Sequence, residues 1–495
     1  MKYLVSGREM KNWEKQAMED YKTPSILLME RAALAVVEEL ISGAYDLHKV
    51  LIACGTGNNG GDGLAVARML KTKGIQTEVC ITGALDRFSP DAKQQFEMYK
   101  AVSGKFVTAP AYGEYTVMVD AMFGIGCNRA IEGVAAEVIE EMNRSKAPVI
   151  AIDVPSGISS DTGKVCGSAL KADVTVTFFT EKLGMMLYPG RDYCGTIKVA
   201  DLGIPFERSE ECRIITYQEQ DLSKLPKRQG NSHKGTYGKV LVIAGSPEIC
   251  GAAYLASAAA YRIGAGLVKV YTPQENRTAM QTLLPEALLE TYDRNRPVLK
   301  QLQQCMEGAD VIVIGPGLGK DRMAEKILRY VIGKSCVPLV IDADGINLLA
   351  ENENKGLLLD AQVPVILTPH IQEMTRLTGV KKENIKKNPF ETAESFAEQY
   401  GVTLVLKDAR TIVAKAGELN YLNLSGNSGM ATGGSGDVLA GMLGGLIAQG
   451  LDELEAARLG VYVHGRAGDA AAAKKGAYSM TATDLFEGIA EVTRV

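Results

Sequence analysis

The chain has 495 residues, of which 46% are hydrophobic and 23% are charged, proportions that are typical of a globular protein. One hydrophobic core rarely grows beyond about 250–300 residues, so we expect two large domains. The formal net charge of −5 argues against a nucleic-acid binder, because contacts with phosphates require a basic surface.

The nine cysteines are scattered, and none forms a C-x-x-C motif or lies beside a histidine cluster. This pattern predicts reduced thiols rather than a disulfide framework or a structural zinc site. The segment 1–20 is too polar for a signal peptide, and no apolar run has the length of a membrane span. We therefore expect a cytoplasmic protein that binds neither membranes nor nucleic acid.

The first half begins with a helical region, in which 25–41 carries apolar residues at helical spacing. We expect this helix to pack on its own domain or on a partner subunit, and we therefore expect a homo-oligomer. Short Val- and Ile-rich runs then alternate with helical stretches, which predicts an α/β domain with a parallel sheet covered on both faces. The predicted strands are 49–53, 77–81, 116–120, 148–153, 173–179 and 196–200.

Regular patterning stops after Asp201-Leu202-Gly203-Ile204-Pro205, and the charged segment 207–211 and the polar segment 221–234 follow. We place the domain boundary near residue 213, which gives domains 1–213 and 214–495. The alternation of strands and helices then resumes, so the second half is also predicted to be α/β. Its predicted strands are 239–244, 267–271, 310–314, 339–342, 363–368 and 402–407.

A glycine-rich segment, Gly55-Thr56-Gly57-Asn58-Asn59-Gly60-Gly61-Asp62-Gly63, follows the first predicted strand and precedes a predicted helix over 64–71. In such a loop, backbone N–H groups and the positive end of the helix dipole face a ligand. The segment is neither a Walker loop nor the standard dinucleotide fingerprint. A tight turn without a ligand is the alternative, but five glycines, two Asn and one Asp in nine residues favour a ligand-binding loop.

Two further predicted strands end in polar motifs. Asp120 ends one strand before Ala121-Met122-Phe123-Gly124, and Asp153 ends the next before Val154-Pro155-Ser156-Gly157. Either Asp alone could be a helix cap or a turn former. Because ligands collect at the carboxyl ends of parallel strands, their joint placement favours a functional site. The Asn59 amide, the Asp120 carboxylate and backbone carbonyls would suit a hard cation.

These motifs, with Asp201-Leu202-Gly203-Ile204-Pro205, closely resemble those of the NAD(P)H-hydrate epimerase family over nearly all of the first ~210 residues. The resemblance implies a Rossmann-like domain that interconverts the R and S epimers of NADHX and NADPHX. It also implies a potassium ion (K+) bound by Asn59, Asp120 and Ser156, and it makes Asp153 the best candidate for acid–base catalysis. The residues implied to contact the hydrated dinucleotide are Asn58, Asn59, Gly60, Gly61, Asp62, Gly124, Ile125, Gly126, Cys127, Asn128, Arg129, Ala130 and Asp153.

A second glycine loop, Gly433-Gly434-Ser435-Gly436-Asp437, leads into an apolar helix. Its glycines can form an anion-binding site at the helix N-terminus. Asp437 would then be placed to take a proton from a hydroxyl that attacks a phosphoryl group. A helix-packing segment of small residues is the alternative, and it explains 440–445 but not Asp437. Other strands of this half end at Gly245-Ser246, Gly315-Pro316-Gly317-Leu318-Gly319, Asp342-Ala343-Asp344-Gly345 and Thr368-Pro369-His370.

The second half resembles the ADP/ATP-dependent NAD(P)H-hydrate dehydratase family, which has a ribokinase-like fold. The resemblance implies an adenine nucleotide bound by Lys407, Asp408, Ala409, Arg410, Thr411 and Gly436, and a hydrate contacted by Ala252, Gly317, His370 and Asp437. Two features depart from the family. Ile371-Gln372-Glu373 follows His370 where Pro-Gly-Glu is frequent, which puts the path of that loop in doubt. Asp408 replaces a common glycine and adds a negative charge near the expected phosphates.

The two resemblances together imply a bifunctional repair enzyme, an isomerase that epimerises NADHX and NADPHX and a lyase that dehydrates the S form. ADP would be converted to AMP and phosphate, and Mg2+ would neutralise the phosphate charge. The resemblance favours ADP over ATP, although the residues themselves do not decide between them. One rival hypothesis is a ribokinase-like small-molecule kinase with an N-terminal nucleotide-binding module. Another makes the first domain a non-catalytic nucleotide-sensing or partner-binding module.

Overall fold

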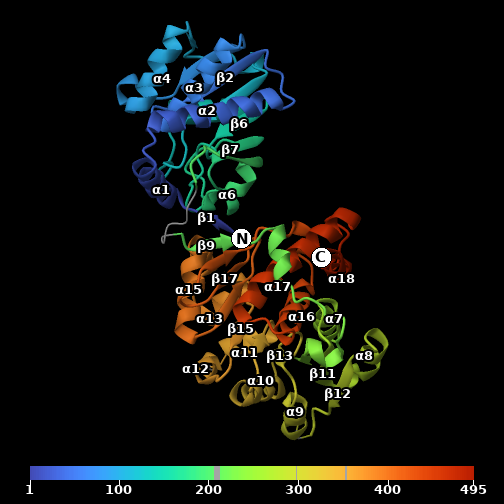
Figure 1. Cartoon of the computed structure of the whole chain (residues 1–495). Helices are drawn as coiled ribbons and strands as arrows, with labels where there is room; N and C mark the ends of the chain where they lie inside the picture. The colour runs from blue at the N-terminus through green and yellow to red at the C-terminus, as the bar shows by residue number, and fades with distance from the viewer. Residues whose placement is uncertain (206–211, 297, 352–353, 495) are drawn as a thin grey trace. The chain divides into compact units, whose positions relative to one another are not determined.

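The computed structural model describes residues 1–205, 212–296, 298–351 and 354–494, so the predicted charged segment 207–211 lies outside the described residues. The chain forms two compact units (Figure 1). We call Tyr3–Arg213 the N-terminal unit, and Ile214–Val495 together with Met1–Lys2 the C-terminal unit. In the described parts of both units, no helix is long and apolar enough to cross a membrane.

The N-terminal unit contains a sheet of seven parallel strands in the order β4-β3-β2-β5-β6-β7-β8. Counted along the chain from β2, this order is 3-2-1-4-5-6-7, which confirms the predicted Rossmann-like fold. All six predicted strands are present, and the two-residue strand β4 is an addition. The strands are β2 (Lys49–Cys54), β3 (Gln76–Ile81), β4 (Lys105–Phe106), β5 (Val117–Ala121), β6 (Val149–Ile152), β7 (Val174–Phe178) and β8 (Thr196–Ala200).

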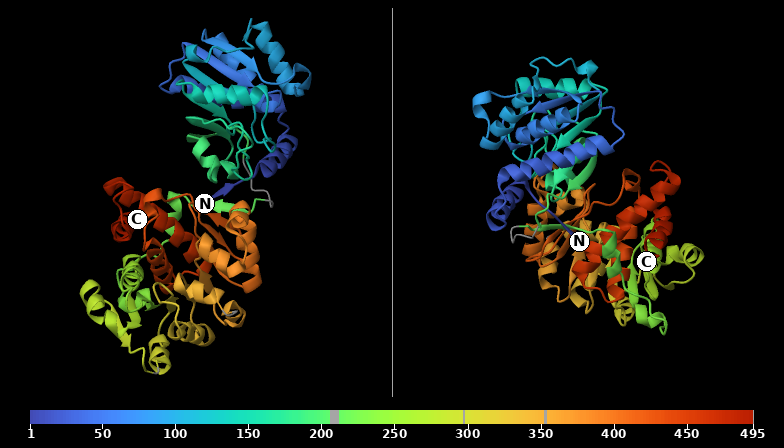
Figure 2. Two further views of the ribbon diagram at one scale, coloured as in Figure 1. Left: turned by 180° about the vertical axis from the view of Figure 1, so that it is seen from behind. Right: turned by 45° about the horizontal axis from the view of Figure 1, so that its top comes forward.

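Alternate residues of β2 face opposite sides of this sheet, as the pleat of a strand requires. Val50 and Ile52 lie in a core with residues of α2 and α3, whereas Leu51 and Ala53 lie in a core with residues of α5. Helices therefore cover both faces and form the predicted three layers (Figures 1 and 2). The helices are α1 (Gly7–Asp20), α2 (Ser25–Ser42), α3 (Asn58–Thr72), α4 (Pro90–Ala101), α5 (Val134–Arg144) and α6 (Leu183–Met186).

The second sheet has eleven strands in the order β1-β9-β18-β17-β16-β15-β14-β13-β10-β11-β12. The stretch from β12 to β16 is parallel and contains all six predicted strands, while β17 is antiparallel to both of its neighbours. The strands are β1 (Lys2–Leu4), β9 (Ile214–Thr216), β10 (Lys239–Ile243), β11 (Leu267–Pro273), β12 (Leu288–Tyr292), β13 (Val311–Ile314), β14 (Leu339–Ile341), β15 (Val365–Leu367), β16 (Thr403–Leu406), β17 (Ile412–Ala414) and β18 (Asn420–Leu422).

The α-helices of the C-terminal unit pack on this sheet and on one another, and α16 contacts α7, β10, β13 and β14. Their bounds are α7 (Gly251–Arg262), α8 (Arg277–Leu283), α9 (Leu299–Met306), α10 (Arg322–Lys334), α11 (Asp344–Ala350), α12 (Leu357–Asp360), α13 (Ile371–Thr378), α14 (Lys382–Lys387), α15 (Pro389–Tyr400), α16 (Ser435–Ala448), α17 (Glu453–Lys475) and α18 (Leu485–Val492).

Glycines allow α16 to approach its neighbours closely. A methyl group on Gly441 would lie 1.9 Å from the carbonyl oxygen of Ala256 in α7. A methyl group on Gly444 would lie 2.4 Å from Cγ2 of Val313 in β13. The packing interpretation therefore explains Gly441 and Gly444, whereas Asp437 lies in the first turn of α16, before them.

Replacing Gly441 by Ala should destabilise the C-terminal unit. Overpacking costs about 1–3 kcal/mol, which outweighs the gain in helix propensity of at most about 1 kcal/mol. Gly333 in α10 is the matched control, because a methyl group there meets nothing within 4 Å. We expect Gly333→Ala to raise the urea midpoint of the C-terminal unit and Gly441→Ala to lower it. Shifts of the same sign in both variants would contradict this packing account.

Candidate active sites

The first candidate site lies where three neighbouring strands of the N-terminal sheet end. β2 lies between β3 and β5, and β5 lies beside β6. Ala53 is paired with Asp120, and Asp120 is paired with Ala151. The residues that follow β2, the Asp120 side chain near the end of β5, and Asp153 directly after β6 therefore lie at one edge of the sheet.

The glycine-rich segment after β2 is helical sooner than predicted. α3 begins at Asn58 rather than at residue 64, so only Gly55, Thr56 and Gly57 connect it to the strand. Tight packing outweighs the low helix propensity of glycine here, because a methyl group on Gly60 would lie 2.0 Å from the carbonyl oxygen of Gly55. Gly61 is also buried, and a methyl group on it would collide with the side chain of Met29.

The polar side chains of this helix start remain accessible. Asn58 is exposed, whereas Asn59 and Asp62 are half-buried. Burial raises the pKa of Asp62 well above its usual value, and the nearby carboxylates Asp153 and Glu14 add to the shift. Asp62 therefore takes up a proton far more readily than an exposed aspartate.

Asp120 and Ser156 form a buried polar pair. The Asp120 carboxylate accepts hydrogen bonds from the Ser156 hydroxyl at 2.6 Å and from the Ser156 N–H at 2.8 Å. The N–H of Met122 donates a third at 3.1 Å, and the N–H of Phe123 donates to the Ser156 hydroxyl at 2.9 Å. Burial raises the pKa of Asp120 to about 6 against the lowering effect of these hydrogen bonds.

Asn59 lies close to Asp153, around Gly124. A methyl group on Gly124 would lie 3.2 Å from Oδ1 of Asn59 and 3.2 Å from Oδ2 of Asp153. The amide nitrogen of Asn59 is buried and has no hydrogen-bond partner among the described residues. A buried, unpaired amide beside a carboxylate is typical of a site that awaits a ligand.

The predicted substrate loop 124–130 is mostly accessible. Gly126 is exposed, as are the three residues Asn128, Arg129 and Ala130. The carbonyl of Ile125 accepts a hydrogen bond of 2.9 Å from the Ser160 hydroxyl, which fixes the start of the loop. Cys127 differs from the rest, because it is buried in the core that also contains α5.

Asp153 has an uncommon backbone conformation for a residue with a side chain. Its φ angle is +67°, and its N–H donates to the carbonyl of Val176 at 2.7 Å. Its Oδ1 accepts hydrogen bonds from Nζ of Lys182 at 2.5 Å and from the hydroxyl of Thr177 at 3.1 Å. A left-handed conformation at a non-glycine residue is strained and is typical of functional sites.

Three residues of this site were not predicted from the sequence. Lys182 and Thr177 contact Asp153 directly. Glu14 of α1 lies near the charged groups of Asp153 and Lys182. Burial raises the pKa of Glu14 to about 7, with Asp153 adding to the shift and Lys182 opposing it. The predicted strand 173–179 could have pointed to Lys182, which follows that strand at the same sheet edge, but no pattern pointed to Glu14.

The second candidate site lies at the ends of β14, β15 and β16, which are neighbours in the C-terminal sheet. Nζ of Lys407 and the hydroxyl of Thr368 each donate a 2.7 Å hydrogen bond to Oδ1 of the buried Asp342. A methyl group on Gly436 would lie 3.2 Å from Nζ of Lys407. The fold therefore brings Lys407 to the N-terminus of α16, beside Asp437.

The environment of Asp437 suits a general base. Burial raises the pKa of Asp437 to about 7; the charge of Asp342 adds to the shift and Lys407 opposes it. A base whose pKa lies near the working pH is both available in its ionised form and able to accept a proton. Gly434, with a φ angle of +94°, precedes α16, so glycine is required at that position.

His370 has a structural role in addition to its place near the site. Its Nδ1 accepts hydrogen bonds from the N–H groups of Gln372 and Glu373, at 3.0 and 3.1 Å, and thereby caps α13. Burial and the charge of Lys407 lower its pKa, which keeps the ring neutral and able to cap. The departure at Ile371 is accommodated by burial of the side chain, and α13 begins there.

The remaining predicted contacts fall into two groups. A methyl group on Gly317 would lie 2.9 Å from Cβ of Ala252, so these two predicted substrate contacts are adjacent. On the nucleotide side, Asp408 and Ala409 are exposed, and Arg410 donates to the carbonyl of Leu424 at 2.9 Å. Thr411 donates to the carbonyl of Asp408 at 3.4 Å. The extra charge of Asp408 is partly balanced by Lys386, at 3.5 Å.

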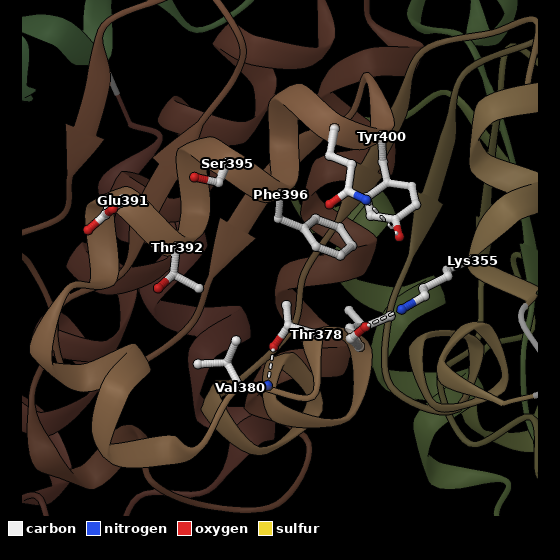
Figure 3. A pocket seen from close by; sticks show the side chains of 10 residues that line it. Lys355, Thr378, Val380, Glu391, Thr392, Ser395, Phe396 and Tyr400 are labelled. Atoms are coloured by element: carbon white, nitrogen blue, oxygen red, sulfur yellow. Dashed lines mark hydrogen bonds between the residues drawn. The ribbon is translucent and has the colours of Figure 1, made fainter.

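A pocket of about 410 Å³ lies elsewhere in the C-terminal unit (Figure 3). Two of its polar side chains are bonded to their own neighbours, since Lys355 donates to the carbonyl of Leu377 and Thr378 accepts from the N–H of Val380. None of the predicted site residues lines it. The lining residues are Lys355, Leu377, Thr378, Val380, Glu391, Thr392, Ser395, Phe396, Gln399 and Tyr400.

Comparison with known proteins covers both units. A family model described as NAD(P)H-hydrate dehydratase matches 240–491, and one described as YjeF-related protein N-terminus matches 25–184. The bifunctional NAD(P)H-hydrate repair enzyme Nnr of Moorella thermoacetica is 38% identical, covering 99% of this chain and 97% of its own length. The Escherichia coli enzyme of the same name is 34% identical, covering 94% and 89%.

A solved structure confirms the predicted fold of the C-terminal unit. A ribokinase-like superfamily protein from Enterococcus faecalis matches with a TM-score of 0.51 and 29% identity. The match covers 58% of this chain and 98% of that protein. With both family models matched and relatives aligned along nearly the whole sequence, the chain belongs to the family of bifunctional NAD(P)H-hydrate repair enzymes.

Proposed function

We propose that the chain repairs hydrated nicotinamide nucleotides in two steps, with domain 1–213 as the epimerase and domain 214–495 as the dehydratase. The first interconverts the R and S epimers of NADHX and NADPHX. The second dehydrates the S epimer to NAD(P)H while ADP is converted to AMP and phosphate. The observation that carries this proposal is the likeness to a bifunctional repair enzyme over 99% of the chain, because the match includes both units.

In the epimerase, Asp153 moves the proton at the hydrated nicotinamide ring. Its Oδ2 faces the space around Gly124, whereas Oδ1 is bound by Lys182 and Thr177. Asn58, Asp62 and the exposed part of the loop 124–130 hold the dinucleotide. The N-terminus of α3, with the positive end of its helix dipole, binds the pyrophosphate. Gly60, Gly61 and Cys127 are buried and contribute through their backbone.

We propose that Asn59, Asp120 and Ser156 hold the K+ of this domain. The residues fit such an ion, since they offer amide, carboxylate and hydroxyl oxygen atoms, and Oδ1 of Asn59 faces the space around Gly124. Asp120 is buried, and a cation would stabilise its charged form. When bound, the ion would neutralise this carboxylate and would be held by the amide and hydroxyl oxygens of Asn59 and Ser156.

In the dehydratase, Asp437 takes the proton of the C6 hydroxyl as the hydroxyl oxygen attacks the terminal phosphate of ADP. AMP leaves, and the phosphorylated hydrate then loses phosphate from C6 and a proton from the neighbouring ring carbon, so the former hydroxyl oxygen departs with the phosphate and the ring double bond of NAD(P)H is restored. Lys407 and the N-terminus of α16, at Gly436, stabilise the negative charge of the transferred group. Ala252, Gly317 and His370 contact the hydrate, and Asp408, Ala409, Arg410 and Thr411 contact the nucleotide.

Mg2+ bound with the nucleotide would neutralise phosphate charge. Because Mg2+ keeps several water ligands and binds largely through phosphates, the site needs few protein oxygens. Asp342 and Asp344, just after β14, provide carboxylates at this sheet edge. ADP remains the proposed nucleotide, with ATP as the alternative to be measured.

Assembly and location are further proposals. Leu27, Leu34 and Ile41 are large apolar residues seven positions apart on α2, and each is more than 40% exposed. Such a stripe on one helix face supports a homo-oligomer in which α2 packs against a second copy. We also propose a cytoplasmic location, with NAD(P)H hydrates and ADP as small-molecule partners.

The function is tested with a mixture of NADHX epimers, ADP and Mg2+, following the absorbance of NADH. We expect complete conversion of both epimers, together with one AMP and one phosphate for each NADH. A stable phosphorylated product without NADH would support the small-molecule kinase instead. Conversion of the S epimer alone, with the R epimer reacting only at its spontaneous rate, would favour a non-catalytic first domain.

The variant Asp437→Asn should lose NADH recovery from the S epimer by about 10²–10⁴-fold, because it removes the general base. In the unmodified chain, the rate should fall as the pH decreases below about 7, because protonation inactivates the base. A pH–rate profile of single-turnover dehydration measures both effects. Unchanged turnover in the variant would rule out this role for Asp437.

Replacing potassium by lithium should slow epimerisation several-fold, because the smaller ion cannot reach the same oxygens. Dehydration of purified S epimer serves as the control and should not change. Asp120→Asn should remove the difference between the epimerisation rates in potassium and in lithium. Equal epimerisation rates in potassium and lithium, for the unmodified chain, would contradict the proposed ion site.

A further inference from the structure

Lys182 is among the most deeply buried charged side chains of the N-terminal unit. Only 1% of the residue is exposed, although a lysine is costly to bury unless its charge is paired. It directly precedes α6, and its side chain runs back to β7 and the end of β6. Its neighbour Leu183 donates a 2.7 Å hydrogen bond from its N–H to the carbonyl of Val5, which anchors the backbone at this point.

The ammonium group has no free proton left for a substrate. Its three protons match three acceptors, namely Oδ1 of Asp153 at 2.5 Å, the hydroxyl of Thr177 at 2.8 Å and the carbonyl of Phe178 at 3.0 Å. The hydroxyl of Thr177 in turn donates to the same Oδ1 of Asp153 at 3.1 Å. Lys182 is therefore built to act on Asp153 rather than on a ligand.

These contacts place the two carboxylate oxygens of Asp153 in different surroundings. Oδ1 is fixed by two donors, whereas Oδ2 accepts no hydrogen bond among the described residues and faces Gly124 and Asn59. The backbone of Asp153 is held in its left-handed conformation by the hydrogen bond to Val176. Both the backbone and one carboxylate oxygen are thus fixed, and one oxygen remains for chemistry.

We propose that Lys182 is the positioning residue of the epimerase, which acts with Thr177 to hold Oδ1 of Asp153 and to present Oδ2 to the hydrated nicotinamide ring. This inference rests on the proposed epimerase function and deepens it. Lys182 neutralises the charge of a carboxylate that would otherwise share the site with Glu14 and Asp62, two further acidic groups nearby. The reacting oxygen is thereby fixed without a direct contact between Lys182 and the substrate.

The decisive experiment compares kcat and KM for epimerisation in four variants of the full chain. Lys182→Met keeps most of the side-chain volume and should lower kcat by about 100-fold, the cost of misplacing a reacting group by roughly 1 Å. KM should change less than about threefold, since Lys182 does not touch the substrate. Thr177→Val should lower kcat by a smaller factor, and Thr177→Ser, which keeps the hydroxyl, should restore it.

Lys198→Met is the matched control. Lys198 lies in the same unit and forms an ion pair of 2.7 Å with Glu39, but half of its side chain is exposed. This pair includes no residue of the candidate site, so neither kcat nor KM should change.

Three outcomes would overturn the proposal. Lys182→Met with kcat close to that of the unmodified chain would do so, as would a loss confined to KM. If Lys182→Met does not fold, the comparison of Thr177→Val with Thr177→Ser tests the proposal. An equal loss of kcat in these two variants would reject the role of the hydroxyl contact. Absence of epimerisation in the unmodified chain would instead refute the proposed function, which separates the two failures.

Discussion

Parallel pairing of neighbouring strands is the constraint on which both sites depend. When strands run in the same direction, their carboxyl ends meet at one edge, and side chains far apart in the sequence become neighbours. In the N-terminal sheet this brings Asp120 and Asp153 beside the start of α3. In the C-terminal sheet it brings Asp342, Thr368 and Lys407 together at the start of α16.

Each site lies at the carboxyl edge of its own sheet, but the two sites place their key carboxylates in different electrostatic surroundings. Asp153 is paired with the buried Lys182, so one of its oxygens is fixed and its charge is balanced. Asp437 has a pKa raised to about 7 by burial and by the charge of Asp342. A paired carboxylate suits the precise placement of a proton, whereas one that titrates near neutrality suits removal of a proton from a hydroxyl.

The sequence predicted the strands and the convergence of their ends well, because continuous apolar runs in a parallel sheet are a strong signal. Helix starts were predicted less well. Asn58 to Gly63 contain glycines that disfavour a helix, yet close packing against Gly55 makes them helical. Lys182 was missed because a lone lysine is usually a surface residue, and only the fold reveals its burial. Glu14 reaches the site from a helix that no strand pattern could place.

The division of the repair between two independent sites is tested most directly by mixing two chains, one with Asp153→Ala and one with Asp437→Asn. The first alone should convert only the S epimer before slowing to spontaneous epimerisation, and the second alone should produce NADH only at its strongly reduced rate. Together, with ADP, they should convert both epimers completely at an enzymatic rate. A mixture that leaves the R epimer reacting at its spontaneous rate would contradict the assignment of one catalytic step to each site.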